Sequence, residues 1–305
     1  MEARHVIRLH GERYLRRLPS IVAYEEGIFP SQGLDVVWIE PDPVRQAFES
    51  VDIQHRIKES LLEQQELDIY KVCQWGGIKR SIEGHQAGIF AVGKPDGSNT
   101  HAVFARAGSD LQGWEDLADR PIGINAHAGS FYGVREILQR HLPSERIQTV
   151  HVGTPLRRLR ALLAGEIEVA ELMDLLIPLA EIKGLVRVLE EADPRPGVFV
   201  ANRNTPVPAL QAFIRAWNQA VDIINHQPEK YQQKAIRKFL EKLPPELQVP
   251  EQDLIDKIQF PRFAHIRRYS REEFWDTYSW MVSNDLIQAG SEYEDAVIAG
   301  LTADT

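Results

Sequence analysis

Short apolar runs that are typical of buried strands alternate along this chain with amphipathic segments that are typical of helices. The strand-like runs span residues 5–10, 36–39, 67–72, 88–92, 101–106, 121–125, 150–152, 167–172 and 186–189. Helical segments lie between them, among them one that ends at Gly27 and others at residues 131–141 and 156–164, and the chain is almost wholly helical from Pro208 onwards. This alternation predicts an α/β protein in which helices flank mostly parallel sheets.

The chain is long enough to form two hydrophobic cores. Its 305 residues exceed the roughly 100–200 that are usual for one domain, and 43% of them are hydrophobic. The turn-rich stretch at 93–100 interrupts the alternation, and we expect it to be the first crossing between two lobes. We predict that lobe 1 comprises residues 1–97 and 195–305, including the helical C-terminal region. Lobe 2 then comprises residues 98–194, with the ligand cleft between the lobes.

Composition and motifs argue against several classes of function. A net charge of −9 makes nucleic acid an unlikely partner, and the short basic clusters at 13–17 and 157–160 are typical of solvated helix faces, although either could supply an arginine to an anion site. The single cysteine, Cys73, excludes an intrachain disulfide and a cysteine-rich zinc site. There is no His-Glu-x-x-His metal motif, no phosphate-binding Gly-x-x-x-x-Gly-Lys loop and no Gly-x-Ser-x-Gly elbow. We expect no metal and no cofactor, and the alternative is a metal site assembled from distant residues. No run approaches the roughly 20 apolar residues of a membrane span.

The N-terminus bears on localisation. Met1 is followed within a few residues by the strand-like run at 5–10, without the apolar stretch of a signal peptide. The sequence as written therefore predicts a cytoplasmic protein. The alternative is a trimmed mature form with an added methionine, which would be periplasmic. In either case we expect a monomer or a dimer.

Four stretches carry a resemblance to a known family. They are IVAYEEGIFPSQGLDVVWIE (21–40), LADRPIGINAHAGSFYGVREILQRHL (117–142), LLAGEIEVAELMDLLIPLAEIKGLVRVLEE (162–191) and PALQAFIRAWNQAVDIINHQPEKY (208–231). Their order and spacing resemble the solute-binding proteins of ABC transporters that handle sulfonates, nitrate or thiamine precursors. The resemblance implies a type 2 periplasmic-binding fold whose lobes close on a small organic acid, such as a sulfonate or an aromatic carboxylate. It also implies an ABC permease as partner if the protein is exported.

The first candidate site follows the strand at 121–125. Gly129 allows close approach of the backbone, and the free N–H groups of the next helix can meet an anion. Ser130 either caps this helix or contacts the ligand, and only one of Phe131 and Tyr132 can point into the cleft. His127 in the same loop is either a donor or proton carrier for the ligand, or a surface histidine.

The second candidate site follows the strand at 67–72. Cys73 ends this strand, and the chain is expected to turn at Gly76 and Gly77 with the indole of Trp75 exposed beside them. Arg80 could neutralise an anionic ligand. The alternatives are that Trp75 packs at the hinge and that Cys73 is an inert buried thiol.

Four further residues occupy loops that line the cleft in the family. Arg13 and Tyr14 follow the first strand, where the resemblance implies a cleft edge. Glu171 and Asp174 flank the end of a strand in lobe 2, where a carboxylate could bind an amine of the ligand. Either residue could instead cap the following helix, and capping is the favoured role for Asp174.

The resemblance leaves two function classes open, because one fold can host several functions. In the first, the protein binds a solute and closes its lobes by a hinge motion. In the second, it is a cofactor-independent lyase or hydrolase, for instance a decarboxylase of an aromatic or heteroaromatic acid, with His55 or His127 as the acid–base residue.

Two catalytic relatives can be compared residue by residue. The thiamine-pyrimidine synthase carries a cysteine-rich run that this chain lacks. The aromatic sulfinate desulfinase is matched loosely at His55 and at residues 75–77. However, Tyr14 stands near the place of its nucleophilic cysteine, and Gln74 near that of its arginine. These departures argue against desulfination, and binding is favoured narrowly over catalysis.

Overall fold

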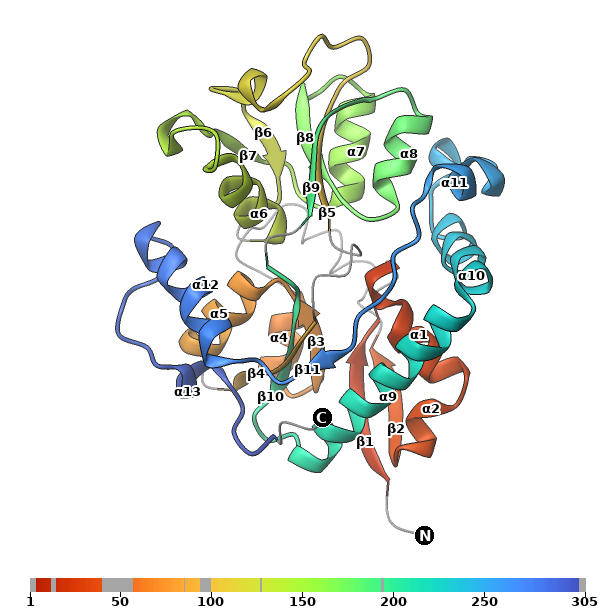
Figure 1. Ribbon diagram of the computed structural model, residues 1–305, viewed down its shortest axis with the longest axis vertical. Helices are drawn as coiled ribbons and strands as arrows, with labels where there is room; N and C mark the ends of the chain where they lie inside the picture. Colours follow the sequence, from red (N-terminus) through yellow and green to blue (C-terminus); the bar gives the residue numbers. More distant parts are fainter. Residues whose placement is uncertain are drawn as a thin grey trace.

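The computed structural model describes residues 4–11, 15–39, 57–84, 86–93, 100–126, 128–192 and 195–301, which form two α/β lobes, one above the other in Figure 1. Each lobe contains one sheet with flanking helices, which confirms the predicted two-lobed α/β architecture. The predicted boundaries at 97/98 and 194/195 fall in or beside segments 94–99 and 193–194, which lie outside the described residues, so the division at these positions stays a prediction.

The sheet of lobe 1, the lower lobe in Figure 1, has the strand order β11-β4-β10-β3-β1-β2. Its strands are β1 (His5–His10), β2 (Leu34–Ile39), β3 (Ile69–Val72), β4 (Ala87–Gly93), β10 (Val198–Asn202) and β11 (Ile266–Arg267). β1 runs parallel to β2 and β3, whereas β10 lies antiparallel between β3 and β4. The fully buried run of β10 was missing from the predicted strands, and its direction makes the sheet mixed rather than mostly parallel.

The sheet of lobe 2 has the strand order β7-β6-β8-β5-β9. Its strands are β5 (Thr100–Ala105), β6 (Ile122–Ile124), β7 (Thr149–His151), β8 (Val169–Leu172) and β9 (Val186–Ala192). β6 runs parallel to β7 and β8, and β5 runs antiparallel to β8 and β9. The carboxyl ends of the parallel strands β6 and β8 therefore lie at one edge of this sheet, where loops can approach lobe 1.

Helices flank both sheets. Those of lobe 1 are η1 (Leu15–Arg17), α1 (Leu18–Glu25), α2 (Ile28–Ser31), α4 (Ile57–Glu63), α5 (Gln74–Glu83), α9 (Val207–His226), α12 (Arg271–Ser283) and α13 (Tyr293–Ala296). Those of lobe 2 are η2 (Trp114–Leu117), α6 (Gly129–Leu138), η3 (Ser144–Arg146), α7 (Pro155–Leu163) and α8 (Leu176–Ile182). The helices predicted at 131–141 and 156–164 are confirmed, with shifted ends.

Glycines mark one agreement with the predicted helices and one departure from them. Gly27 has φ 69°, and α1 ends beside it as predicted, whereas the short helix α2 lies where a turn was expected. Gly76 and Gly77 lie inside α5, so the predicted turn at these residues is wrong. A Cβ on Gly77 would lie 2.5 Å from Val198 Cγ2 of β10, so this glycine allows α5 to pack closely on the sheet.

A helical segment connects the two lobes along one side. It contains α10 (Pro228–Leu240), η4 (Pro245–Leu247) and α11 (Glu251–Lys257), and it rises from α9 towards α8 in Figure 1. Lys183 Nζ of lobe 2 donates to the carbonyl of Glu246 at 3.2 Å, and Arg160 pairs with the Glu246 carboxylate. One hydrophobic cluster contains Phe199 of lobe 1 and Leu179 of lobe 2, so the two cores are continuous. None of the helices in the described part of the chain has the length and apolar composition needed to cross a bilayer.

Candidate functional site

The first turns of α5 and α6 face each other across the boundary between the lobes. Cys73 follows β3 and is the N-cap residue of α5, and Ala128 is the N-cap residue of α6 in the loop after β6. A Cβ built on Gly129 would lie 3.4 Å from Cys73 Cβ and 3.8 Å from Cys73 Sγ. The structure thus brings together the two glycine-containing segments that the sequence singled out separately.

Backbone donors gather at this meeting point. The N–H groups of Gln74, Trp75 and Gly76 in α5, and of Gly129 and Ser130 in α6, make no hydrogen bond to another described residue. Helix N-termini leave such donors unpaired and carry a partial positive charge. No side chain caps either helix in the described segments. Two opposed N-termini can therefore stabilise an anion from both lobes.

The hydroxyl of Ser130 is bonded to the loop before α6. Its Oγ accepts the N–H of Asn125 at 2.9 Å and lies 3.4 Å from the carbonyl oxygen of the same residue. Ser130 is buried, and this bonding fixes the path of the chain between β6 and α6.

The aromatic candidates pack against one another. Trp75 is fully buried, so the expectation of an exposed indole is wrong. Its ring stacks on Tyr132 with centroids 5.6 Å apart and also lies 6.2 Å from the ring of Trp280 in α12. Tyr132 is also buried, whereas Phe131 is partly exposed. Trp75 therefore packs between the two lobes, and the hinge packing considered from the sequence stays a prediction.

Three cationic side chains gather where β3 meets α5. Arg17 Nη2 donates to the carbonyl oxygen of Lys71 at 2.8 Å, and Lys58 Nζ lies 3.2 Å from the same oxygen. The Nζ of buried Lys71 lies 5.7 Å from the ring centroid of Phe199 and 5.4 Å from that of Trp217. Sequence reasoning favoured a solvated helix face for the cluster that contains Arg17, with a contribution to an anion site as the alternative, and it missed both lysines. A lysine in an otherwise apolar strand was the available signal.

The two acidic candidates of lobe 2 make different contacts. Asp174 has φ 59°, and its Oδ1 accepts the N–H of Leu175 at 2.8 Å and that of Leu15, from lobe 1, at 3.2 Å. Asp174 thus links the lobes. Glu171 is fully buried, with Oε1 2.7 Å from His101 Nδ1 and Oε2 accepting a bond from Arg158 Nη2.

Arg80 lies away from the meeting point of α5 and α6. It lines a cavity of about 300 Å³ in lobe 1, between α4, α5 and the start of β4, together with the carboxylates of Glu59, Glu63 and Glu83. Three carboxylates around one guanidinium make this cavity unsuitable for an anion.

Four predicted site residues lie outside the described residues: Arg13, Tyr14, His55 and His127. Their proposed contacts, including both acid–base roles, stay predictions. Across the described segments, no group of three or more His, Cys, Asp or Glu side chains is arranged to hold a metal ion.

Two α/β lobes with opposed helix N-termini between them define the class of two-lobed solute-binding proteins. Residues 34–239 match the family described as ABC transporter, phosphonate, periplasmic substrate-binding protein. The match covers more than half of the chain, so the protein belongs to this family of ABC-transporter substrate-binding components. A search of curated protein sequences found no match.

Solved structures share the fold over nearly the whole chain. The aliphatic sulphonate-binding protein SsuA of Escherichia coli superposes with a TM-score of 0.74 at 13% identity, covering 99% of this chain and 94% of that one. The alkanesulfonate-binding protein SsuA of Xanthomonas axonopodis pv. citri, bound to MOPS, gives 0.70 at 14% identity, covering 97% and 96%. The nitrate-binding protein NrtA of Synechocystis PCC 6803 gives 0.67 at 12% identity, covering 94% and 83%.

These findings confirm the resemblance read from the sequence. The shared fold agrees with the sulfonate and nitrate branch, and the family is periplasmic. The periplasmic alternative is thus supported, whereas the cytoplasmic expectation has no support. As a member of this family the protein is a small-molecule binder that works with an ABC permease.

Proposed function

We propose that this protein binds a small organic oxyanion between the first turns of α5 and α6. The proposal rests on one observation: the N-termini of two helices, one from each lobe, face each other. Together they present five backbone N–H groups that make no hydrogen bond to a described residue. An anion held by both helices would link the lobes, because each lobe supplies part of its coordination.

The charges around β3 support an anionic ligand. Arg17 and Lys58 both approach the carbonyl of Lys71, which lies two residues before the N-cap of α5. These cations add to the positive ends of the two helix dipoles. Glu171 in lobe 2 is bonded to His101 and Arg158. Its negative charge therefore does not offset the positive charges of Arg17 and Lys58 at the helix starts.

The headgroup we favour is a phosphonate or a sulfonate. Either presents three oxygens in a tetrahedral arrangement, so donors on opposite sides can be satisfied at once, whereas the two oxygens of a carboxylate lie in one plane. The family match and the sulfonate-binding structural neighbours agree with this choice. An aromatic carboxylate is the weaker candidate.

A thermal-shift screen followed by calorimetry tests the proposal. Methylphosphonate, ethanesulfonate, nitrate and benzoate are added at increasing concentration, and a ligand at 100 times its Kd should stabilise the protein by about 2.7 kcal/mol. We expect methylphosphonate or ethanesulfonate to raise Tm most. If all four leave Tm unchanged up to millimolar concentration, the proposed ligand class is wrong.

A matched pair of glycine variants tests whether the ligand binds between the helix starts. In Gly129→Ala the new methyl group lies at an ordinary contact distance from Cys73, so the fold tolerates it, but it occupies the space between the helix starts. In Gly93→Ala the nearest atom is 4.0 Å away, which makes this variant the control. We expect Gly129→Ala to weaken binding at least about tenfold, equivalent to 1.4 kcal/mol, and Gly93→Ala to leave Kd unchanged. If Gly129→Ala binds the ligand as tightly as Gly93→Ala does, the ligand does not bind between α5 and α6.

The enzyme alternative gains no support from the described residues. Its acid–base candidates, His55 and His127, lie outside them, and His101 is engaged by Glu171. We therefore propose binding and transport alone.

A further inference from the structure

Arg195 connects the two lobes in the passage from β9 to β10. Its Nε and Nη2 bond to the two carboxylate oxygens of Glu136, in α6 of lobe 2, at 3.0 and 2.9 Å. Its Nη1 bonds to Asp276 and, at 3.0 Å, to Thr277 Oγ1, both in α12 of lobe 1. One buried guanidinium thus binds a helix of each lobe.

The contacts of Arg195 continue to the first residue of α5. Thr277 Oγ1 accepts from Arg195 and donates to Gln74 Oε1 at 2.7 Å. Tyr269 Oη lies 3.0 Å from the same Gln74 oxygen. Gln74 is buried and supplies one of the unpaired N–H groups of α5. The position of this ligand-facing residue is therefore fixed through Thr277 by Arg195.

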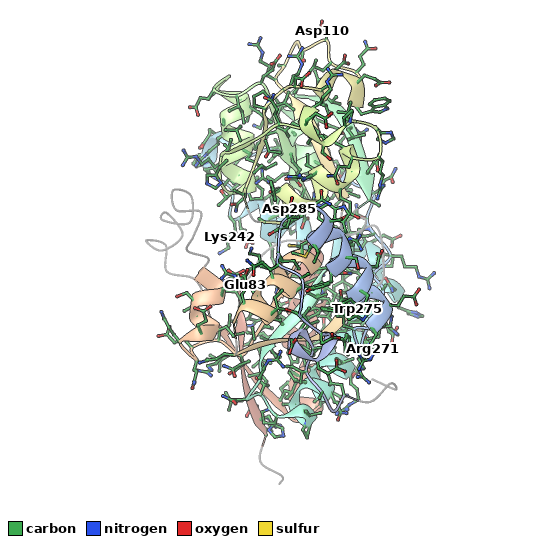
Figure 2. All side chains as sticks on the ribbon, turned by 90° about the vertical axis from the view of Figure 1, so that its left-hand side faces the viewer. Glu83, Asp110, Lys242, Arg271, Trp275 and Asp285 are labelled. Carbon is green, nitrogen blue, oxygen red and sulfur yellow. The ribbon has the colours of Figure 1, made fainter. Side chains whose placement is uncertain are left out.

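Two more contacts lie on the same face of α6. Tyr132 stacks on Trp75, Glu136 binds Arg195, and Gln139 Nε2 donates to Asn284 Oδ1 at 2.6 Å. The spacing of four and then three residues places them along one side of the helix. In Figure 1 α6 lies directly above α5 and α12, and in Figure 2 Asp285, which follows Asn284, lies at the level where the lobes meet. The face therefore docks lobe 2 on lobe 1.

The Arg195–Glu136 pair is suited to a fixed geometry. Both side chains are almost buried, with 9% and 11% of their surface exposed, so solvent screens their attraction little. The bidentate contact also fixes the relative angle of the two groups. Although burial opposes the charge, the bonds to Glu136 and Asp276 outweigh it and raise the pKa of Arg195.

We propose that Arg195 is a positioning residue for ligand binding: it clasps α6 to α12 and so holds the N-termini of α5 and α6 at the separation that an oxyanion bridges. The effect on ligand binding rests on the proposed function, whereas the contacts of Arg195 with α6 and α12 hold the lobes together without a ligand. Two variants weaken it. Arg195→Lys keeps the charge but loses the two-pronged contact, and Glu136→Gln keeps the shape but loses the charge.

Arg8→Lys is the matched control. Arg8 Nε and Nη2 bond to both oxygens of Asp68, at 3.0 and 2.7 Å, in a two-pronged contact that is more exposed and lies wholly within lobe 1. Urea unfolding first establishes that each variant is folded. Variants that are not folded are replaced by Asp276→Asn, which removes the exposed partner of Arg195 and leaves its buried pair with Glu136 intact.

Small-angle X-ray scattering of ligand-free protein tests the clasp without any ligand. We expect Arg195→Lys and Glu136→Gln to increase the radius of gyration, because the lobes separate, and Arg8→Lys to leave it at the wild-type value. If folded Glu136→Gln has the wild-type radius of gyration, Arg195 does not hold the lobes together, whatever ligand the protein binds.

Binding kinetics with methylphosphonate test the effect on the site. Weakening a charged hydrogen bond should reduce the population of the closed state and raise the dissociation rate roughly ten- to hundredfold, with the association rate changed less. Unchanged dissociation in both clasp variants would overturn the positioning role. If methylphosphonate binds neither the wild type nor any variant, the proposed ligand is wrong. The scattering result still shows whether Arg195 holds the lobes together.

Discussion

The rings of Trp75 and Tyr132 stack across the boundary between the lobes at 5.6 Å and 18°. They extend from the first and second turns of the two helices whose N-termini face each other. The stack therefore lies beside the candidate site and sets how closely those helices approach. Stability and ligand binding should both depend on it.

Removing the indole should destabilise the protein strongly. Trp75 is fully buried and touches both Tyr132 and Trp280, so Trp75→Ala should lower the free energy of unfolding by about 3–5 kcal/mol. Trp275→Ala, at a tryptophan that is 36% exposed on α12, is the control and should cost much less. Urea unfolding measures both, and equal losses would show that the stack is not a packing centre.

An alanine at Gly133 should destabilise the same helix that Gly129→Ala leaves intact. A Cβ on Gly133 would lie 2.5 Å from His101 Nε2, and His101 is held by Glu171. Alanine normally favours a helix over glycine by about 1 kcal/mol, but here overpacking should reverse the sign and cost about 1–3 kcal/mol. Thermal unfolding of Gly133→Ala beside Gly129→Ala checks this, and a stabilised Gly133→Ala protein would contradict it.

Removing the charge of Glu171 should be more costly than removing an exposed one. Arg158 and Glu171 have 1% and 0% of their side chains exposed, so Glu171→Gln removes a buried negative charge from beside the buried guanidinium. We expect a loss of about 3–5 kcal/mol in the free energy of unfolding. Glu168→Gln, which breaks the exposed pair with Arg120, should cost less than about 1 kcal/mol.

Acid should weaken the start of α12. Burial raises the pKa of Glu273, but bonds from Arg267 and Ser270 outweigh it and hold the pKa below the ordinary value of 4.5. Its contribution is therefore complete above about pH 4.5 and is lost as the pH falls through the lower folded-state value. Glu273→Gln should show a smaller decrease in stability between pH 7 and pH 3 than the wild type. Urea unfolding at each pH measures this, and an equal decrease in the free energy of unfolding for the variant and the wild type would refute it.

The fold was largely predictable because the periodicity of apolar residues is local. β1 was predicted at its observed ends, and α7 and β8 were predicted with their ends shifted by one or two residues. β10 was not predicted because it does not pair with the strand that precedes it: β9 belongs to the sheet of lobe 2, and the long helix α9 follows β10. Its partners β3 and β4 lie more than one hundred residues away along the chain.

The candidate site was predictable only in part. A glycine shortly after a strand is a local pattern, and it pointed separately to the loop with Gly129 and to the segment that begins at Cys73, although a turn rather than a helix start was predicted there. That these two residues lie side by side depends on how the lobes pack, which no local pattern encodes. The role of Arg195 was invisible for the same reason, since Glu136, Asp276 and Thr277 come from two other elements.

Amide chemical shifts test the central claim most directly. In a titration of isotopically labelled protein with methylphosphonate, the N–H groups of Gln74, Trp75, Gly76, Gly129 and Ser130 should shift most, because they would donate to the oxyanion. Saturable shifts centred on these residues in both lobes are the predicted result. Shifts confined to one lobe, or centred on the cavity beside Arg80, would contradict an oxyanion held between α5 and α6.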